Sequence, residues 1–196
     1  MSELHDAIEK ENIKEIRLLI KSGVDVNEQS FRMMSYEEFT PLSLAIGVNN
    51  IEIINLLIEN GADIHAKNNS ETALHNAAYK GLSEVVRLLI NKGANIYDKN
   101  GSRETPLHFA VMKGHKEIAK ILLDNGMSIN IKNYRGSTPL HYAAYDGYAG
   151  MAQFLIDNGA DFYARNNLGY TPLDEAEKSG HTEVADLLKA AMNRKD

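Results

Sequence analysis

The side chains of this sequence best suited to chemistry are its seven histidines. Three of them, His75, His108 and His141, occupy the same position in successive copies of a Thr-Xaa-Leu-His stretch. A zinc ion needs each ligand nitrogen within about 2.1 Å, whereas packed helices lie about 8–10 Å apart. Histidines on successive copies of one repeat are too far apart to share an ion, so we expect no metal site.

Other groups that could take part in catalysis lack the required context. The stretch from Gly147 to Gly150 is not followed by the Lys-Ser/Thr pair of a phosphate-binding loop. No serine lies in a nucleophile-elbow pattern, and the chain has no cysteine. The acidic run from Asp174 to Glu177 is explained better as a solvated helix face than as paired catalytic carboxylates. We therefore expect no catalytic residue and no cofactor.

Composition restricts the partners and the compartment. The chain has 196 residues and a formal net charge of −6, and no apolar run approaches the roughly 18 residues of a membrane span. Nucleic-acid binders usually carry a basic stripe, because phosphate contacts supply much of their affinity. We expect neither a nucleic acid nor a membrane as partner. The lack of cysteine and of an N-terminal apolar signal indicates a cytoplasmic protein, with nuclear entry or signal-less secretion into a host cell as alternatives. We expect it to be monomeric.

The elements that must position these side chains follow a repeat. Copies of a Thr-Xaa-Leu stretch are spaced by 32 or 33 residues, and all four prolines follow one of these threonines. Threonine caps helix N-termini well, and proline is tolerated in the first helical turn. In most copies a glycine follows the first helix, and a second glycine ends a second helix with apolar residues at helical spacing. The copies begin at Thr40, Thr72, Thr105, Thr138 and Thr171.

This period of two short helices, with the motif Thr-Pro-Leu-His-Xaa-Ala, resembles the ankyrin repeat. A sixth copy opens the chain at Leu4, with Ser2 in the place of the threonine. The resemblance covers essentially the whole chain and implies an all-α solenoid of six stacked helix-turn-helix repeats with short β-turn fingers. We expect one complete, self-capped domain over residues 1–196, with repeats at about 1–37, 38–69, 70–102, 103–135, 136–168 and 169–196.

The resemblance also implies roles for the motif and for the surface. In ankyrin repeats the motif histidine hydrogen-bonds the turn and the threonine of its own repeat, which gives a structural role to Thr72, His75, Thr105, His108, Thr138 and His141. Solenoids of this kind bind partners through a concave surface. We expect a non-catalytic module that binds a protein partner of unknown identity, as an adaptor, an inhibitor or an effector. The alternatives are a structural or self-associating scaffold and a substrate of asparagine hydroxylation at Asn27 or Asn130.

Candidate contact residues follow from their position at the fingers and at the ends of the first helices. Tyr79, Met112 and Tyr145 recur at one helix position and form a column whose residue types are typical of interface anchors. The alternative is that these side chains merely cover the neighbouring helix. The other candidates in the repeats are Lys80, Lys113, Tyr134, Arg135, Asp146 and Tyr170.

The finger between the first two repeats is longer than the others. From Gly23 to Thr40 the chain advances 17 residues, whereas the equivalent intervals are 11 or 12, so an insertion lies within residues 28–38. Its apolar side chains favour a lid on the first repeats or a contact element, for which methionine is well suited; a disordered loop is the third alternative. The candidate contact residues here are Phe31, Met33, Met34, Tyr36 and Phe39.

Two further patterns concern charge and stability. A column of basic residues follows the second helices, and we interpret it as a polar feature of the repeat rather than as a track for an acidic partner; it consists of Lys67, Lys99, Lys132 and Arg165. Gly150 stands where four other repeats have glutamate early in the second helix. Glycine lowers helix stability there, so we expect the C-terminal repeats to open before the middle ones.

Overall fold

The computed structural model describes residues 2–32 and 37–193, leaving aside the side chains of residues 31–32 and 37–38. Over these ranges the chain forms twelve helices and four short strands, which confirms the all-α repeat fold expected from the sequence. No described helix is long and apolar enough to cross a membrane. The elements are α1 (Glu3–Glu9), α2 (Ile13–Lys21), β1 (Ser30–Arg32), β2 (Glu37–Phe39), α3 (Pro41–Val48), α4 (Ile51–Glu59), β3 (Lys67–Asn68), β4 (Glu71–Thr72), α5 (Ala73–Lys80), α6 (Ser83–Asn91), α7 (Pro106–Met112), α8 (Lys116–Asp124), α9 (Pro139–Tyr145), α10 (Ala149–Asp157), α11 (Pro172–Lys178) and α12 (Thr182–Asn193).

Contacts within the chain divide it into two compact units. The N-terminal unit comprises Met1–Ala77 and Glu84–Asn95, and the C-terminal unit comprises Ala78–Ser83 and Ile96–Asp196. The division falls within α5 after Ala77 and within α6 after Ser83, so both helices contribute residues to both units. The expectation of one domain over the whole chain stays a prediction.

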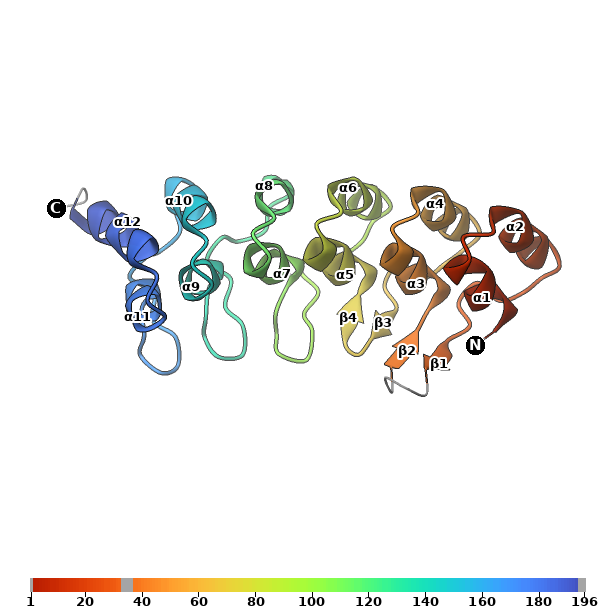
Figure 1. Ribbon diagram of the computed structural model, residues 1–196, viewed down its shortest axis with the longest axis horizontal. Coiled ribbons are helices and arrows are strands. Elements are labelled where there is room, and N and C mark those ends of the chain that lie inside the picture. The colour runs from red at the N-terminus through yellow and green to blue at the C-terminus, as the bar shows by residue number, and fades with distance from the viewer. Residues whose placement is uncertain (1, 33–36, 194–196) are drawn as a thin grey trace. The chain divides into compact units, whose positions relative to one another are not determined.

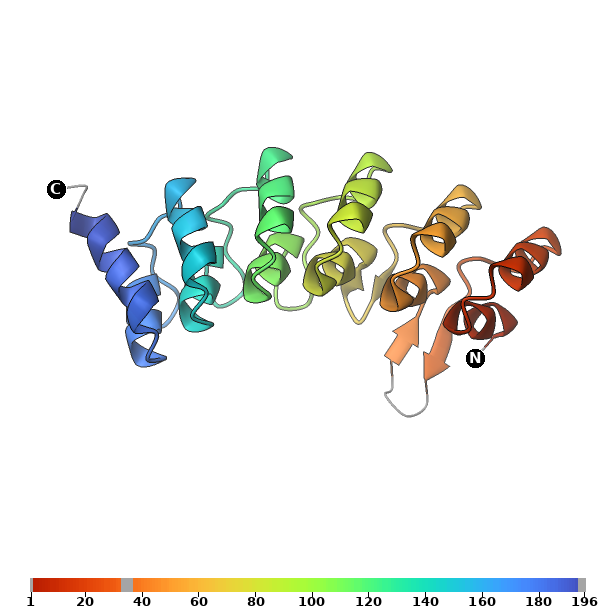
Figure 2. The same cartoon turned by 45° about the horizontal axis from the view of Figure 1, so that its top comes forward.

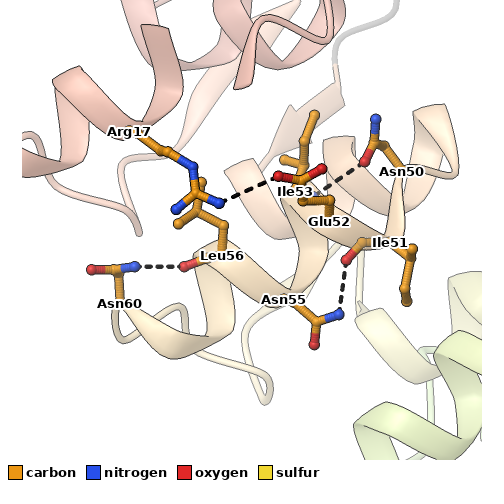
Figure 3. Close-up of polar contacts among 8 residues, drawn as sticks. All are labelled: Arg17, Asn50, Ile51, Glu52, Ile53, Asn55, Leu56 and Asn60. Carbon is orange, nitrogen blue, oxygen red and sulfur yellow. Dashed lines mark hydrogen bonds and ion pairs between the residues drawn. The ribbon is translucent and has the colours of Figure 1, made fainter. Parts of the chain in front are cut away.

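The N-terminal unit contains two complete helical hairpins, α1–α2 and α3–α4, and α1 packs against α3. Arg17 of α2 and Glu52 of α4 form an exposed ion pair, with 3.3 Å between Nη2 and Oε1 (Figure 3). Such exposed pairs contribute at most about 1 kcal/mol. The hairpins are therefore held mainly by their shared core, whose fully buried members include Leu4, Ile8, Ile16, Leu42, Ile46, Ile53, Ile54 and Leu57.

The C-terminal unit arranges its helices in two rows. Figure 1 shows α7, α9 and α11 in one row, α8, α10 and α12 in the other, and the finger loops on the far side of the first row. Figure 2, turned by 45°, shows the second row side by side again. Helix α9 packs against both of its neighbours in the first row, α7 and α11. Each of these three helices carries a fully buried alanine at the last position of the motif, namely Ala110, Ala143 and Ala176.

The helix ends follow the repeat motif. Thr105, Thr138 and Thr171 are the N-cap residues of α7, α9 and α11, each with proline in the first turn. The four interhelix glycines have φ between 71° and 80°, the left-handed region that glycine reaches at low cost; they are Gly81, Gly114, Gly147 and Gly180. The predicted positions of both helix starts and reversals are therefore confirmed.

Each interhelix glycine but the last lies under a ring from the next repeat. A Cβ added at Gly147 would lie 2.4 Å from Nδ1 of His181, and one added at Gly81 would lie 2.6 Å from Cε1 of His115. At Gly114 the equivalent ring belongs to Tyr148, and an added Cβ would lie 3.6 Å from its nearest carbon, an ordinary van der Waals distance. His115 and His181 are therefore packing residues of the repeat. Each directly follows the interhelix glycine of its own repeat.

The inserted finger begins and ends as a β-hairpin. Strands β1 and β2 pair antiparallel, with Ser30 opposite Phe39 and Arg32 opposite Glu37. Phe31 belongs to β1 by its backbone, and Phe39 is half-buried. The side chain of Phe31 and the residues Met33, Met34 and Tyr36 lie outside the described part of the chain, so the choice among lid, contact element and disorder stays a prediction.

Gly150 lies in the first turn of α10 with open space around it, since a Cβ there would meet nothing within 4 Å. We expect Gly150→Ala to raise the free energy of unfolding by about 0.5–1 kcal/mol, because alanine restricts the unfolded chain and favours the helix. Urea unfolding followed by circular dichroism measures the change.

Gly159 is the control for this substitution. A methyl group added there would also meet no atom within 4 Å, but the φ of this glycine is +87°. Gly159→Ala should therefore destabilise the protein by about 1–2 kcal/mol. A Gly150→Ala variant that unfolds at lower urea than the parent would contradict the account of α10.

Candidate functional site

The motif histidines hold the starts of the first helices. In the C-terminal unit the backbone N–H of Thr105 donates to Nδ1 of His108 at 3.1 Å, and Thr138 does the same to His141 at 3.1 Å. In the N-terminal unit Thr72 and His75 pair in the same way at 3.2 Å. All three rings are buried. This geometry matches the structural role that the resemblance implies.

Two of these histidine positions also tie one hairpin to the next. His141 Nε2 lies 3.0 Å from the carbonyl oxygen of Tyr170, just before the threonine of the following hairpin. His5 occupies the equivalent position in the first hairpin and contacts the Phe39 carbonyl at 3.0 Å and the Ser2 hydroxyl at 2.7 Å. The sequence alone showed no partner for His5, because Phe39 lies 34 residues away along the chain.

The finger loops of the C-terminal unit are rigid turns. Oδ1 of Asn133 accepts hydrogen bonds from the backbone N–H groups of Arg135 at 2.9 Å and Ser137 at 3.0 Å. Asn100 and Asn166 make the same pair of bonds in their own fingers. Asparagine mimics a backbone turn in this way. These bonds therefore hold the backbone of each finger in one turn conformation.

Neighbouring fingers are joined by backbone hydrogen bonds. The N–H of Tyr134 donates to the carbonyl of Ser102 at 2.9 Å, and the N–H of Asn167 donates to the carbonyl of Arg135 at 2.9 Å. The three loops, residues 100–104, 133–137 and 166–170, thus form one continuous edge of the C-terminal unit.

The first helices turn one side toward this edge. The Tyr142 hydroxyl of α9 donates to Glu104 and accepts from Nδ2 of Asn133 at 2.9 Å, and both partners belong to fingers. Burial first, and then the Glu104 hydrogen bond, raise the pKa of Tyr142 above its ordinary value. Lys178 of α11 donates to the Tyr170 hydroxyl at 3.1 Å, with its Nζ 4.3 Å from the centre of that ring. The helix positions of Tyr142 and Lys178 therefore face the fingers.

Tyr79, Met112 and Tyr145 occupy the helix position of Lys178 in the three preceding repeats, so the same side of their helices carries them. We name as the finger-side face the surface formed by these four residues, by the residues that directly follow them, by Tyr142 and its equivalent Glu175, and by the three finger loops. Tyr79 is 45% exposed and Tyr145 59% exposed, while Met112 is half-buried. Exposed aromatic rings beside a half-buried methionine form a surface of the type that anchors partner proteins.

Tyr79 also packs within the protein. Its ring meets Phe109 edge-on at 6.0 Å, and Lys113 places its Nζ 4.5 Å from the ring centre. The carbonyl of Tyr79 lies 3.1 Å from Nε2 of His115. The side chain therefore covers the neighbouring helix and remains exposed on its outer side, so both interpretations of the column hold in part for this residue.

The remaining predicted contact residues divide between exposed and engaged side chains. Tyr134, at 71% exposure, and Arg135 project from one finger, and Lys80 and Lys113 are exposed at the helix ends. Asp146 is half-buried, and this burial raises the pKa of its carboxyl while the charges of Lys113 and His181 oppose the rise.

The position in the repeat predicts Leu168 and Lys178 as contact residues but does not predict Arg103. Arg103 is exposed in the finger before Glu104, and Leu168 is 77% exposed in the last finger. Lys178 shares the column position of the two tyrosines, which is the signal that selects it from the sequence. Exposed tyrosines also occur after the second helices, at Tyr97 and Tyr163, where Tyr97 donates to the Gly126 carbonyl at 3.2 Å.

Two residues of the basic column after the second helices make hydrogen bonds within the protein. Lys132 donates to the carbonyl of Arg165 at 3.1 Å, and Arg165 donates to the carbonyl of Gly169 at 2.6 Å. These bonds favour the structural interpretation of the column. Among the described residues, no group of three histidine or acidic side chains is placed to hold a metal ion.

Comparison with known families identifies the repeats. A family profile described as ankyrin repeats (3 copies) matches residues 2–68 and 64–133, and one described as ankyrin repeats (many copies) matches residues 122–176. A comparison with curated proteins gives no match.

Proposed function

This chain belongs to the ankyrin-repeat family, and from that premise we propose that the finger-side face of its C-terminal unit binds a protein partner. Ankyrin repeats are generally protein–protein interaction modules and generally non-catalytic. The observation that carries the proposal is the exposure of Tyr79 and Tyr145 at one helix position beside Met112, next to rigid fingers. The protein then acts by binding a partner, and the identity of that partner decides whether it is an adaptor, an inhibitor or an effector.

Rigidity of the face supports this function. The fingers are fixed by their asparagine turns and by the hydrogen bonds between neighbouring loops. A preformed surface avoids much of the entropy loss that ordering loops adds to binding. The aromatic rings carry only two rotatable side-chain bonds each, so they too lose little freedom.

The hydroxylation alternative is less well supported, because the asparagine concerned already has a structural role. Nδ2 of Asn27 donates to the Gly61 carbonyl at 3.0 Å, and Oδ1 accepts from the N–H of Asp63 at 2.7 Å. Asn130 likewise accepts from the N–H of Asp161 at 2.8 Å. These side chains join consecutive repeats, which explains their presence without modification.

The test is affinity capture from the native cell followed by measurement with purified partner. We expect Tyr79→Ala/Tyr145→Ala to weaken binding by about 2–4 kcal/mol, because aromatic anchors at the centre of an interface dominate its energy. Tyr97→Ala/Tyr163→Ala is the matched control: the two control tyrosines are 54% and 52% exposed but lie after the second helices. Equal affinities for the two variants would refute the proposed face.

A further inference from the structure

The finger-side face combines aromatic side chains with an uneven distribution of charge. Its exposed charged side chains in the described part of the C-terminal unit are cations, namely Lys80, Arg103, Lys113, Arg135 and Lys178. Its acidic side chains, Glu104, Asp146 and Glu175, are only partly exposed. The whole chain has a formal net charge of −6, so this face differs in sign from the molecule that carries it.

Hydrogen bonds within the protein occupy two of these carboxylates. Glu104 accepts from the Tyr142 hydroxyl and from Nδ2 of Asn100 at 3.0 Å. Glu175 accepts from Nδ2 of Asn166 at 2.9 Å. For Asp146, burial raises the pKa of the carboxyl. The negative charges are therefore directed inward to the fingers and helices, and the positive charges meet the solvent.

Two of the cations are held at the surface by aromatic rings. The ammonium group of Lys113 lies 4.5 Å from the centre of the Tyr79 ring, and that of Lys178 lies 4.3 Å from the centre of the Tyr170 ring. Cation–π contacts keep long lysine side chains against the protein without removing their charge. The face thus offers fixed positive charge directly beside apolar ring surface.

We propose that the partner of this face is an acidic protein segment with apolar side chains between its carboxylates. Carboxylates meet Lys113, Lys178, Arg103 and Arg135, and apolar side chains meet the rings and Met112. Opposite charges across an interface accelerate encounter and select partners. The inference rests on the proposed function and adds to it the chemistry of the partner.

A nucleic acid fits the same observations less well. Phosphates would also meet the cations, but a strand that continues past the face also approaches the rest of the chain. The rest of the chain, with its net negative charge, then repels the strand at distances within the Debye length of about 8 Å. A short acidic segment contacts the cationic face alone.

Fluorescence anisotropy with defined probes tests the proposal. The probes are a fluorescein-labelled peptide of repeated Glu-Glu-Leu, its Gln-Gln-Leu and Lys-Lys-Leu counterparts, and oligothymidylate. We expect the Glu-Glu-Leu peptide to bind roughly tenfold more tightly than the Gln-Gln-Leu peptide at low salt, and this advantage to shrink at high salt. Lys113→Glu/Arg135→Glu should weaken binding of the acidic peptide about tenfold.

Lys14→Glu/Lys92→Glu is the control, since it changes the net charge equally at exposed positions in α2 and just after α6. We expect it to alter affinity by no more than about twofold. Equal binding of the glutamate and glutamine peptides, equal loss in the control, or oligothymidylate bound as tightly as the acidic peptide would overturn the inference. Preference for the Lys-Lys-Leu peptide would also overturn it and leave the proposed function standing, because that function is judged by the tyrosine variants.

Discussion

Gly147→Ala is expected to lower the free energy of unfolding by about 2–5 kcal/mol, and two effects contribute. A residue other than glycine in the left-handed region costs about 1–2 kcal/mol, and φ at Gly147 is +74°. The new methyl group would also lie 2.4 Å from the His181 ring, which must swing aside. Overpacking of this kind costs about 1–3 kcal/mol. Urea unfolding followed by circular dichroism measures the sum.

Gly180→Ala separates the two effects. Its φ of +77° is almost the same, but no atom lies within 4 Å of the added methyl group. This variant should lose only the backbone part, about 1–2 kcal/mol. Adding His181→Ala to Gly147→Ala should recover part of the difference between the two glycine variants. If Gly147→Ala and Gly180→Ala are equally stable, the packing of the His181 ring on the glycine is not a determinant of the fold.

Acidification is expected to remove roughly 3 kcal/mol of stability between about pH 6.5 and pH 4 through His108 alone. Burial is the largest cause that lowers the pKa of His108, from 6.5 to about 4, and it outweighs the backbone of Ser137 and the charge of Glu104, which raise the pKa. Above pH 6.5 the ring is neutral in both states and has no effect. As the pH falls, the unfolded chain takes up the proton first, so unfolding becomes easier until the folded ring is protonated near pH 4.

The measurement is the urea dependence of unfolding at a series of pH values for the parent and for His108→Asn. The variant should be less stable at neutral pH, because it loses contacts of a buried ring, but its stability should fall less steeply with acid. His65→Asn is the control, since His65 is exposed. Parallel pH profiles for the parent and His108→Asn would show that His108 is not the group that titrates.

The fold could be predicted because the sequence of each repeat contains local signals for the starts and ends of its helices. The threonine caps, the first-turn prolines and the left-handed glycines are local signals, and the structure places helix starts and reversals at them. Each signal acts within a few residues of itself, so no knowledge of the neighbouring repeat is needed to interpret it.

Contacts between repeats could not be predicted in the same way. The bond from Tyr142 to Glu104 joins residues 38 positions apart, and the bond from His5 to Phe39 joins residues 34 positions apart. Both depend on the distance and rotation between neighbouring hairpins, which the period of the sequence does not contain. The same limit explains why the inward direction of the carboxylates, and with it the cationic face, emerges only from the structure.

For the candidate contact residues, the side of the helix could be predicted from the sequence, but the contacts of each side chain could not. Position in the motif was enough to select Tyr79, Met112 and Tyr145, because equivalent residues of a repeat face the same side. It could not separate exposure from internal packing, and Tyr79 has both. For Met33, Met34 and Tyr36 the contact role remains a prediction from composition, outside the described residues.

Hydrogen exchange of the protein with and without its captured partner tests the central claim most directly. If the finger-side face is the binding surface, the partner should slow exchange of the amides in residues 101–104, 134–137 and 167–170 and at the ends of α7 and α9. Slowed exchange confined to α8, α10 and α12, with the finger amides unchanged, would place the partner on the other side of the helices and contradict the account.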